Sequence, residues 1–289
     1  GAPPKTTGIA VLRFIRSIGG GALAAPGGIS AGPDGFLAVC DTGRRVVLRM
    51  SAGGDITARF GGIDPRSGGL FSPLDAAAGN GVDVFVLDGS SGKVYRFDRL
   101  LRGAVVMFDP GRGYSGRSSS DRFAPFGGIA LDPESGDLFL TDRNEGTVIR
   151  IDHAGNTVRE TGGFGGERKS LRFPTGLDVA RDGAIVVADP GLGAIAFAPR
   201  FGAGMRLLGG GVLDAPVDVA ALPDGRIAVV DSKGVVIMER SGEEVCSAGY
   251  GTDRKMAPRA VAFHDGLLFI SDAVTRAVLV YRLEAGLSR

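Results

Sequence analysis

The feature that most constrains this chain is an internal repeat of a proline, two short apolar stretches and an aspartate. Each aspartate follows its proline by 14 to 17 residues, and successive prolines are 42 to 52 residues apart. A fixed period of this size indicates stacked similar units, because one unit alone cannot bury its apolar face. The six prolines are Pro26, Pro73, Pro125, Pro174, Pro216 and Pro258. The six aspartates are Asp41, Asp88, Asp142, Asp189, Asp231 and Asp272.

Each unit has the pattern of four short antiparallel strands. In the fourth unit a first strand follows Pro174, the turn Arg181-Asp182-Gly183 comes next, and a second strand ends at Asp189. Asp-Gly favours such turns because glycine accepts a positive φ. No stretch has the sustained apolar period of a capped helix. Six units therefore predict an all-β, six-bladed β-propeller with four antiparallel strands per blade, which occupies residues 1–289 as a single domain.

The two ends of the chain predict how the ring closes. The sixth unit begins at Pro258, supplies three strands and stops near Leu283. Residues 9–18 resemble the missing fourth strand, so we expect them to pair with residues 278–281 and to complete the last blade. We expect this strand to bury Ile9, Val11 and the stretch Ile15–Ile18. Pairing the chain ends in one sheet removes two exposed strand edges.

The units share the order Pro-x-Gly-Ile, then Asp-Gly, then Val-x-Asp, then Arg-Val, and this pattern resembles the NHL repeat from Ile9 to Leu283. The segment at residues 44–46 keeps the basic residue of the family's last element, whereas the segment at residues 193–195 does not. The resemblance implies a propeller of a family that includes protein and RNA binders, periplasmic or secreted repeat proteins and a few enzymes. A fold used so widely does not decide the function.

Charge and hydropathy exclude few partners. The net charge of the 289 residues is +1, which argues neither for nor against a nucleic-acid partner. No apolar run approaches the length of a membrane span. A periplasmic or secreted location is favoured, with any signal or anchor segment absent from this sequence. Cys40 and Cys246 fall in different units, so we expect no disulfide between them.

One motif and two histidines associated with catalysis are better explained by their places in the repeat and its turns. Residues 28–32 match G-x-S-x-G, which requires a strained strand-to-helix turn, but they lie in the first strand of a unit. The two histidines, His153 and His264, both lie in predicted turns. The resemblance to peptidyl-hydroxyglycine amidating lyases would require a zinc site of several histidines, which two turn histidines cannot supply.

Three aspartates stand out in the strands expected to line the central channel. Counted from the repeated proline, Asp75 and Asp218 are at the second position and Asp178 is at the fourth, so all three face the same side of their strands. Oxygen-rich clusters suit Ca²⁺ or Mg²⁺, which makes these residues candidate metal ligands. Gluconolactonase-like propellers use Glu, Asp and Asn around a central divalent cation, yet the first strands here carry no Glu. The simpler interpretation is solvated carboxylates in a wet channel.

The two faces of the predicted ring differ in charge. The turns after the repeated aspartate and the links before each proline form a basic rim, whose candidate binding residues are Arg44, Arg45, Lys93, Arg122, Arg143, Arg168, Arg172, Arg259 and Arg276. The opposite turns are rich in acids, among them Asp34, Asp83, Asp132, Glu134, Asp137, Asp182 and Asp224.

Three functions follow from these features. The leading hypothesis is a non-enzymatic scaffold that binds a partner protein or peptide through the basic rim. The first alternative is a divalent-metal-dependent hydrolase or lyase, lactonase-like, that uses Asp75, Asp178 and Asp218. The second alternative is RNA binding, which requires aromatic side chains among the basic residues so that bases can stack.

Overall fold

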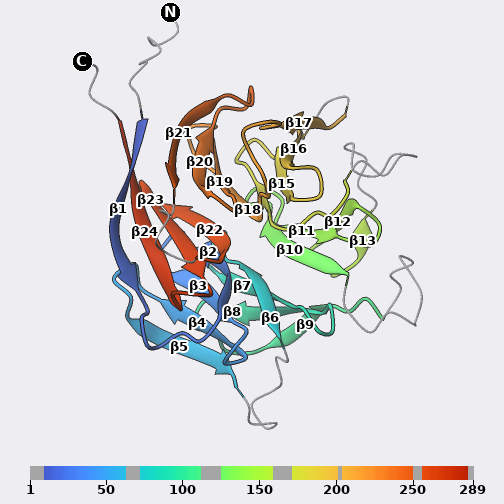
Figure 1. Ribbon diagram of the computed structural model, residues 1–289. Helices are drawn as coiled ribbons and strands as arrows, with labels where there is room; N and C mark the ends of the chain where they lie inside the picture. Colours follow the sequence, from blue (N-terminus) through green and yellow to red (C-terminus); the bar gives the residue numbers. More distant parts are fainter. Residues whose placement is uncertain are drawn as a thin grey trace, which may run out of the picture.

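The computed structural model describes residues 10–62, 72–111, 125–158, 171–200, 204–249 and 256–285. These residues form six four-stranded antiparallel sheets, and no helix occurs among them. Figure 1 shows the sheets arranged as blades around a common centre, in chain order. The all-β, six-bladed β-propeller predicted from the repeat is therefore confirmed. The described residues contain no helical segment long and apolar enough to cross a membrane.

The strands are numbered along the chain, and blade 1 begins at the first repeated proline. Blade 1 comprises β2 (Pro26–Ala31), β3 (Leu37–Asp41), β4 (Val46–Met50) and β5 (Ile56–Gly61). Blade 2 comprises β6 (Pro73–Ala77), β7 (Asp83–Asp88), β8 (Val94–Asp98) and β9 (Val105–Phe108). Blade 3 comprises β10 (Phe126–Leu131), β11 (Leu138–Asp142), β12 (Thr147–Ile151) and β13 (Thr157–Val158).

The last three blades follow the same plan. Blade 4 comprises β14 (Leu177–Val179), β15 (Ile185–Asp189), β16 (Ala194–Ala198) and β17 (Arg206–Leu208). Blade 5 comprises β18 (Asp218–Ala221), β19 (Ile227–Val230), β20 (Gly234–Met238) and β21 (Glu244–Gly249). Blade 6 comprises β22 (Pro258–His264), β23 (Leu267–Asp272), β24 (Ala277–Ala285) and the N-terminal strand β1 (Ala10–Ile18).

The hydrophobic core is divided among the gaps between blades. Six clusters of buried side chains are present in the described residues, and each joins two consecutive blades. The cluster between blades 2 and 3, for example, contains Leu87 and Phe108 from one blade, and Phe126 and Leu140 from the next. Since burial of apolar area is the main stabilising term, each blade depends on both neighbours for its core.

The closure predicted from the chain ends is confirmed, although the buried face of the strand differs from the prediction. β1 pairs antiparallel with β24, with Ile18 opposite Val278 and Phe14 opposite Tyr281 (Figure 1). A bulge between Phe14 and Arg16 shifts the register and so changes which side chains face the core. Val11 is 47% exposed, while Ile18 is 5% exposed. Ile9 lies outside the described residues.

The six repeated aspartates are buried structural acceptors. Asp41 accepts hydrogen bonds from the backbone N–H groups of Ala24 and Ala25, at 2.8 and 2.9 Å, and from that of Arg44 at 3.1 Å. One carboxylate thus accepts hydrogen bonds from N–H groups in two segments, the link that enters the blade and the turn that follows the second strand. Buried N–H groups left without an acceptor cost about 1–3 kcal/mol each, which accounts for an acid at this position in every unit.

We expect removal of residues 1–20 to leave β24 with an unpaired edge and to open the ring. The truncated protein should aggregate or show a large fall in melting temperature, because an exposed strand edge is a template for pairing with other chains. Thermal unfolding and size-exclusion chromatography would measure both effects. Removal of residues 1–9 is the matched control, since it leaves β1 intact. A 21–289 fragment as stable and monomeric as the full chain would refute the closure.

Candidate active site in the central channel

The inner strands of the six blades enclose a cavity of about 240 Å³ at one end of the channel. Asp75 of β6, Asp178 of β14 and Asp218 of β18 all line it, together with Ser30 of β2. Most of the other lining residues are Ala, Val, Leu and Ile from the same strands. The three aspartates singled out from the sequence therefore contribute to one cavity. Their role there stays a prediction.

Each channel aspartate is tied to the next blade. Asp75 Oδ2 accepts a hydrogen bond from the N–H of Ile129 at 2.9 Å, and Asp178 Oδ2 accepts one from Ala221 at 2.8 Å. Asp218 Oδ2 accepts one from the N–H of Val261 in blade 6 at 2.7 Å. Because these bonds link neighbouring blades at the axis, the carboxylates are fixed in place by the backbone that surrounds them.

A serine performs the same task in blade 1. Ser30 Oγ accepts a hydrogen bond from the N–H of Ala78 in blade 2 at 3.1 Å. Ser30 and Asp178 are the fourth residues after their repeated prolines, so they are equivalent positions. A hydroxyl is thus sufficient to join two blades here, and the fold does not require the negative charge of Asp178. Ser30 lies within β2, as the repeat predicts, and not on a strand-to-helix turn.

Two glycines leave room for two of the carboxylates. A Cβ atom on Gly28 would lie 2.1 Å from Asp75 Oδ1, and one on Gly176 would lie 1.7 Å from Asp218 Oδ1. Both distances are far below any real contact, so a side chain at either glycine would displace the neighbouring aspartate. The glycine of one blade and the aspartate of the next are therefore a matched pair.

Burial raises the pKa of all three channel aspartates. It raises the pKa of Asp75 to about 6, although hydrogen bonds from Ile129 and Ala76 oppose the shift and the charge of Asp178 adds to it. Burial also raises the pKa of Asp178 to about 6. The pKa of Asp218 is raised well above its ordinary value by burial and then by the charge of Asp75. Asp75 and Asp178, with pKa values of about 6, can exchange protons near neutral pH.

The sequence analysis missed a basic residue at this cavity. Arg181 lines the cavity and has no ion-pair partner within the described part of the chain. A signal was present, because Arg181 is the seventh residue after its proline, where two other units have Pro33 and Pro223. Arg181 is exposed, so it can meet a ligand that enters the cavity.

The three carboxylates have the donor chemistry of a Ca²⁺ or Mg²⁺ site. In the described residues, however, no three Asp, Glu, His or Cys side chains are grouped as the ligands of one ion. Asp75 and Asp178 instead each direct both carboxylate oxygens at backbone N–H groups. The arrangement therefore does not fit a preformed metal centre, and no chemical step is derived through an ion.

The residues of the predicted basic rim make different kinds of contact and do not act as one group. Arg44 and Lys93 contact acids, with 3.9 Å from Arg44 to Asp41 and 3.1 Å from Lys93 to Asp109. Arg45 and Arg276 occupy left-handed turn positions, and Arg172 donates to the carbonyl of Gly191. Arg143 and Arg259 line a second cavity at the other end of the channel. Arg122 and Arg168 lie outside the described residues.

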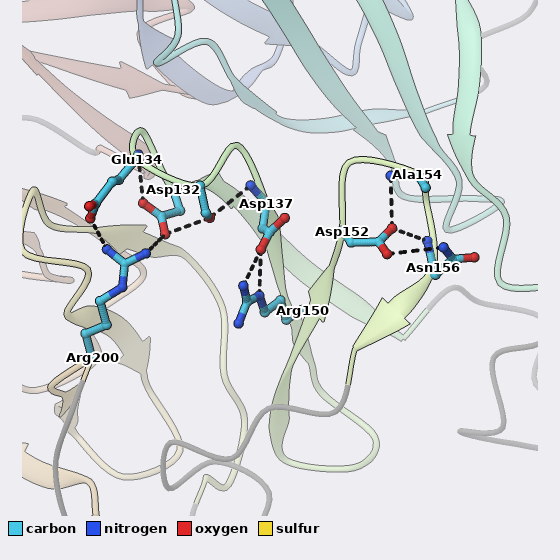
Figure 2. A network of polar contacts seen from close by, with 9 residues as sticks. Asp132, Glu134, Asp137, Arg150, Asp152, Ala154, Asn156 and Arg200 are labelled. Carbon is cyan, nitrogen blue, oxygen red and sulfur yellow. Dashed lines mark hydrogen bonds and ion pairs between the residues drawn. The ribbon is translucent and has the colours of Figure 1, made fainter.

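The acidic turns on the opposite face are largely neutralised by arginines. Figure 2 shows Arg200 between Asp132 and Glu134, with 2.8 Å to Asp132, and Arg150 against Asp137, with 2.7 Å from Nε. The same arrangement recurs in the pairs Arg49–Asp34, Arg96–Asp83, Arg226–Asp224 and Arg240–Asp182. The charge difference between the faces is consequently much smaller than the turn sequences alone indicate.

Comparison with solved structures places the chain among six-bladed propellers. A gluconolactonase from Xanthomonas campestris superposes with a TM-score of 0.64 at 15% identity, over 96% of this chain and 92% of its own. Virginiamycin B lyase from Staphylococcus aureus superposes with a TM-score of 0.62 at 10% identity, over 95% and 100%. A streptogramin B lyase gives 0.61 at 13% identity, over 95% and 98%. No protein-family model and no curated protein matches the chain.

These comparisons correct the leading hypothesis from the sequence. The prediction of a non-enzymatic scaffold that binds through the basic rim is wrong, because several neighbours that cover nearly the whole chain are named as a gluconolactonase or as lyases. The ion pairs across the acidic turns remove its physical basis as well. The RNA-binding alternative relied on the same rim arginines. The likeness supports the propeller fold, whereas the finer NHL assignment stays a prediction.

We expect the melting temperature to be a few degrees higher at pH 5 than at pH 8. The raised pKa values of Asp75 and Asp178 mean that the folded state binds protons between pH 4 and 7 that the unfolded state, with its ordinary value of 3.8, releases. The free energy of unfolding therefore falls as pH rises through this window. Below pH 4 the trend reverses, because the hydrogen bond from Arg240 lowers the pKa of Asp182.

Asp178→Ser is the matched variant for this measurement, since it copies the residue that blade 1 uses at the same position. It keeps an acceptor for the N–H of Ala221 and removes one titrating carboxyl. The difference in melting temperature between pH 5 and pH 8 should be smaller in this variant. A parent protein whose stability is level or rises between pH 5 and 8 would contradict the assigned shifts.

Proposed function

We propose that this propeller is a hydrolase or lyase that opens a lactone-like cyclic ester in the cavity lined by Asp75, Asp178 and Asp218. The observation that carries the proposal is one cavity lined by three carboxyls whose pKa values are all raised by burial, those of Asp75 and Asp178 to about 6. Perturbed carboxyls in a cleft are typical of acid–base sites. The structural neighbours named as a gluconolactonase and as lyases support the same class of reaction.

Two of the carboxyls have complementary roles in ring opening. Asp178 is largely ionised at neutral pH and takes a proton from water, while the water oxygen bonds to the ester carbonyl carbon. The ring C–O bond then breaks, and its oxygen takes a proton from Asp218, whose pKa is raised well above its ordinary value by burial and by the charge of Asp75. The product is a hydroxy acid, and solvent restores the proton to Asp218 and removes the one on Asp178.

An elimination would use the same two groups. In a lyase, Asp178 takes a proton from a carbon atom next to the bond that breaks, and Asp218 protonates the oxygen that leaves. No water is consumed, and the product contains a new C=C bond. Arg181, at the edge of the same cavity, is placed to bind a carboxylate or carbonyl oxygen of the substrate.

The size of the cavity favours a small ring. Its volume of about 240 Å³ is below the roughly 300–1,000 Å³ of pockets for drug-sized ligands. Sugar lactones with five- or six-membered rings are therefore the first substrates to test. Quinupristin, which is named with one of the neighbours, a virginiamycin B lyase, is the second compound to test, as a probe of the elimination reaction.

We expect Asp178→Ser to lower kcat/KM for the best lactone by about 10² to 10⁴-fold, the range for loss of a general base. Each hydrolysis releases one proton, because the hydroxy acid ionises, so a pH-indicator assay reports turnover directly. The parent kcat/KM should rise with pH through about 6, as the Asp178 carboxyl ionises.

The matched control is Asp265→Asn, which removes a carboxylate from an exposed turn that does not line the cavity. Asp265 has a φ of 46°, a conformation that asparagine adopts readily, so this variant should fold and keep full activity. Equal activity of Asp178→Ser and the parent, with unchanged melting temperatures, would rule out Asp178 as the base.

We expect turnover to survive dialysis against EDTA, because proton transfer between carboxyls and substrate requires no bound ion. The measurement compares the parent before chelation, after chelation, and after addition of Ca²⁺ or Mg²⁺. Activity that is lost on chelation and restored by either cation would contradict the proton-transfer mechanism. It would show instead that Asp75, Asp178 and Asp218 converge on a divalent cation during the reaction.

A further inference from the structure

A second cavity, of about 150 Å³, lies at the other end of the channel. It shares Asp75 and Asp218 with the first cavity, so these two carboxyls separate the two ends. The remaining lining includes the inner-strand glycines and two arginines, Arg143 and Arg259. The chemistry of the two ends therefore differs, since carboxyls predominate at one and guanidinium groups enter at the other.

Arg143 has an unsatisfied donor at this cavity. Its Nε is the one buried side-chain nitrogen or oxygen atom, among the described residues, that has no hydrogen-bond partner. The guanidinium carbon lies 5.3 Å from the centroid of the Phe173 ring, and this contact helps to fix its orientation. A charged side chain that is short of acceptors is costly, so a ligand oxygen that meets the Arg143 guanidinium group from the cavity would be favourable.

Arg259 approaches the same cavity from the opposite side. It lies on β22 of blade 6, whereas Arg143 follows β11 of blade 3, and blades 3 and 6 face each other across a ring of six. Arg259 is exposed, and no acid pairs with it or with Arg143 in the described ranges. This contrasts with the arginines of the acidic turns, which are paired.

We propose that Arg143 and Arg259 form a binding site for a small oxyanion of the phosphate class at this mouth of the channel. Guanidinium groups present planar, fixed pairs of donors that match the oxygens of phosphate. Gly28, Gly127 and Gly176 have no side chains to fill the space between the two arginines. The carboxylates of Asp75 and Asp218, which separate the two cavities, each accept a hydrogen bond from a backbone N–H of blade 3 or blade 6. We therefore expect the anion to bind to the two arginines and not beside these carboxylates.

Calorimetric titration with inorganic phosphate tests the site. We expect saturable binding of one phosphate per chain, at least about tenfold weaker in Arg143→Gln and in Arg259→Gln. Acetate should bind more weakly than phosphate, because it has one charge and two oxygens for two guanidinium groups. Arg259 is exposed, so Arg259→Gln should fold even if Arg143→Gln is destabilised.

The matched control is the double variant Arg13→Gln, Arg59→Gln, which removes two exposed arginines from the outer strands β1 and β5. Its phosphate affinity should equal that of the parent. Absence of saturable binding to the parent, or an equal loss of affinity in the control, would overturn the proposal. Asp178→Ser should bind phosphate normally, so this outcome is independent of whether the lactone reaction occurs.

Discussion

The six inner strands converge on one axis, and the space available there determines most of what this propeller can do. The carboxylates of Asp75 and Asp218 fit at the axis because the neighbouring blade has a glycine beside each, Gly28 for Asp75 and Gly176 for Asp218. The confinement that demands these glycines also removes water from the carboxyls, which raises their pKa values. The crowding of the inner strands at the axis therefore explains both the paired glycines and the raised pKa values of the carboxyls.

The hydrogen bonds between blades hold the inner strands together, but they do not require the acceptor side chain to be charged. Ser30 and Asp178 occupy equivalent positions and each accepts a backbone N–H of the next blade. A serine in blade 4 would hold the ring together equally well and would avoid burying a charge. The presence of an acid with a raised pKa, where a neutral acceptor suffices, is what most favours the proposed acid–base role of the channel over a purely structural one.

The fold could be predicted from the sequence because the repeat encodes it locally. Proline, turn and aspartate recur within each unit, and the missing strand of the last unit pointed to the chain start. Alternation along the first strands also placed Asp75 and Asp218 in the channel. What failed depended on side-chain contacts and on irregular backbone. Arg200 pairs with acids more than 60 residues away, Arg150 pairs with Asp137, 13 residues away, and β1 contains a bulge. The repeat pattern contains none of these facts, so the charge asymmetry was overestimated.

The shared carboxyls also couple the two ends of the channel. Asp75 and Asp218 line both cavities, so a ligand that enters from either end meets the same two carboxyls. The proposed oxyanion is negative, so its binding near these carboxyls disfavours their ionised forms. By linkage, protonation of the two carboxyls strengthens binding of that anion in the same proportion. The proposed lactone reaction and the proposed anion site are therefore connected through the carboxyls between them.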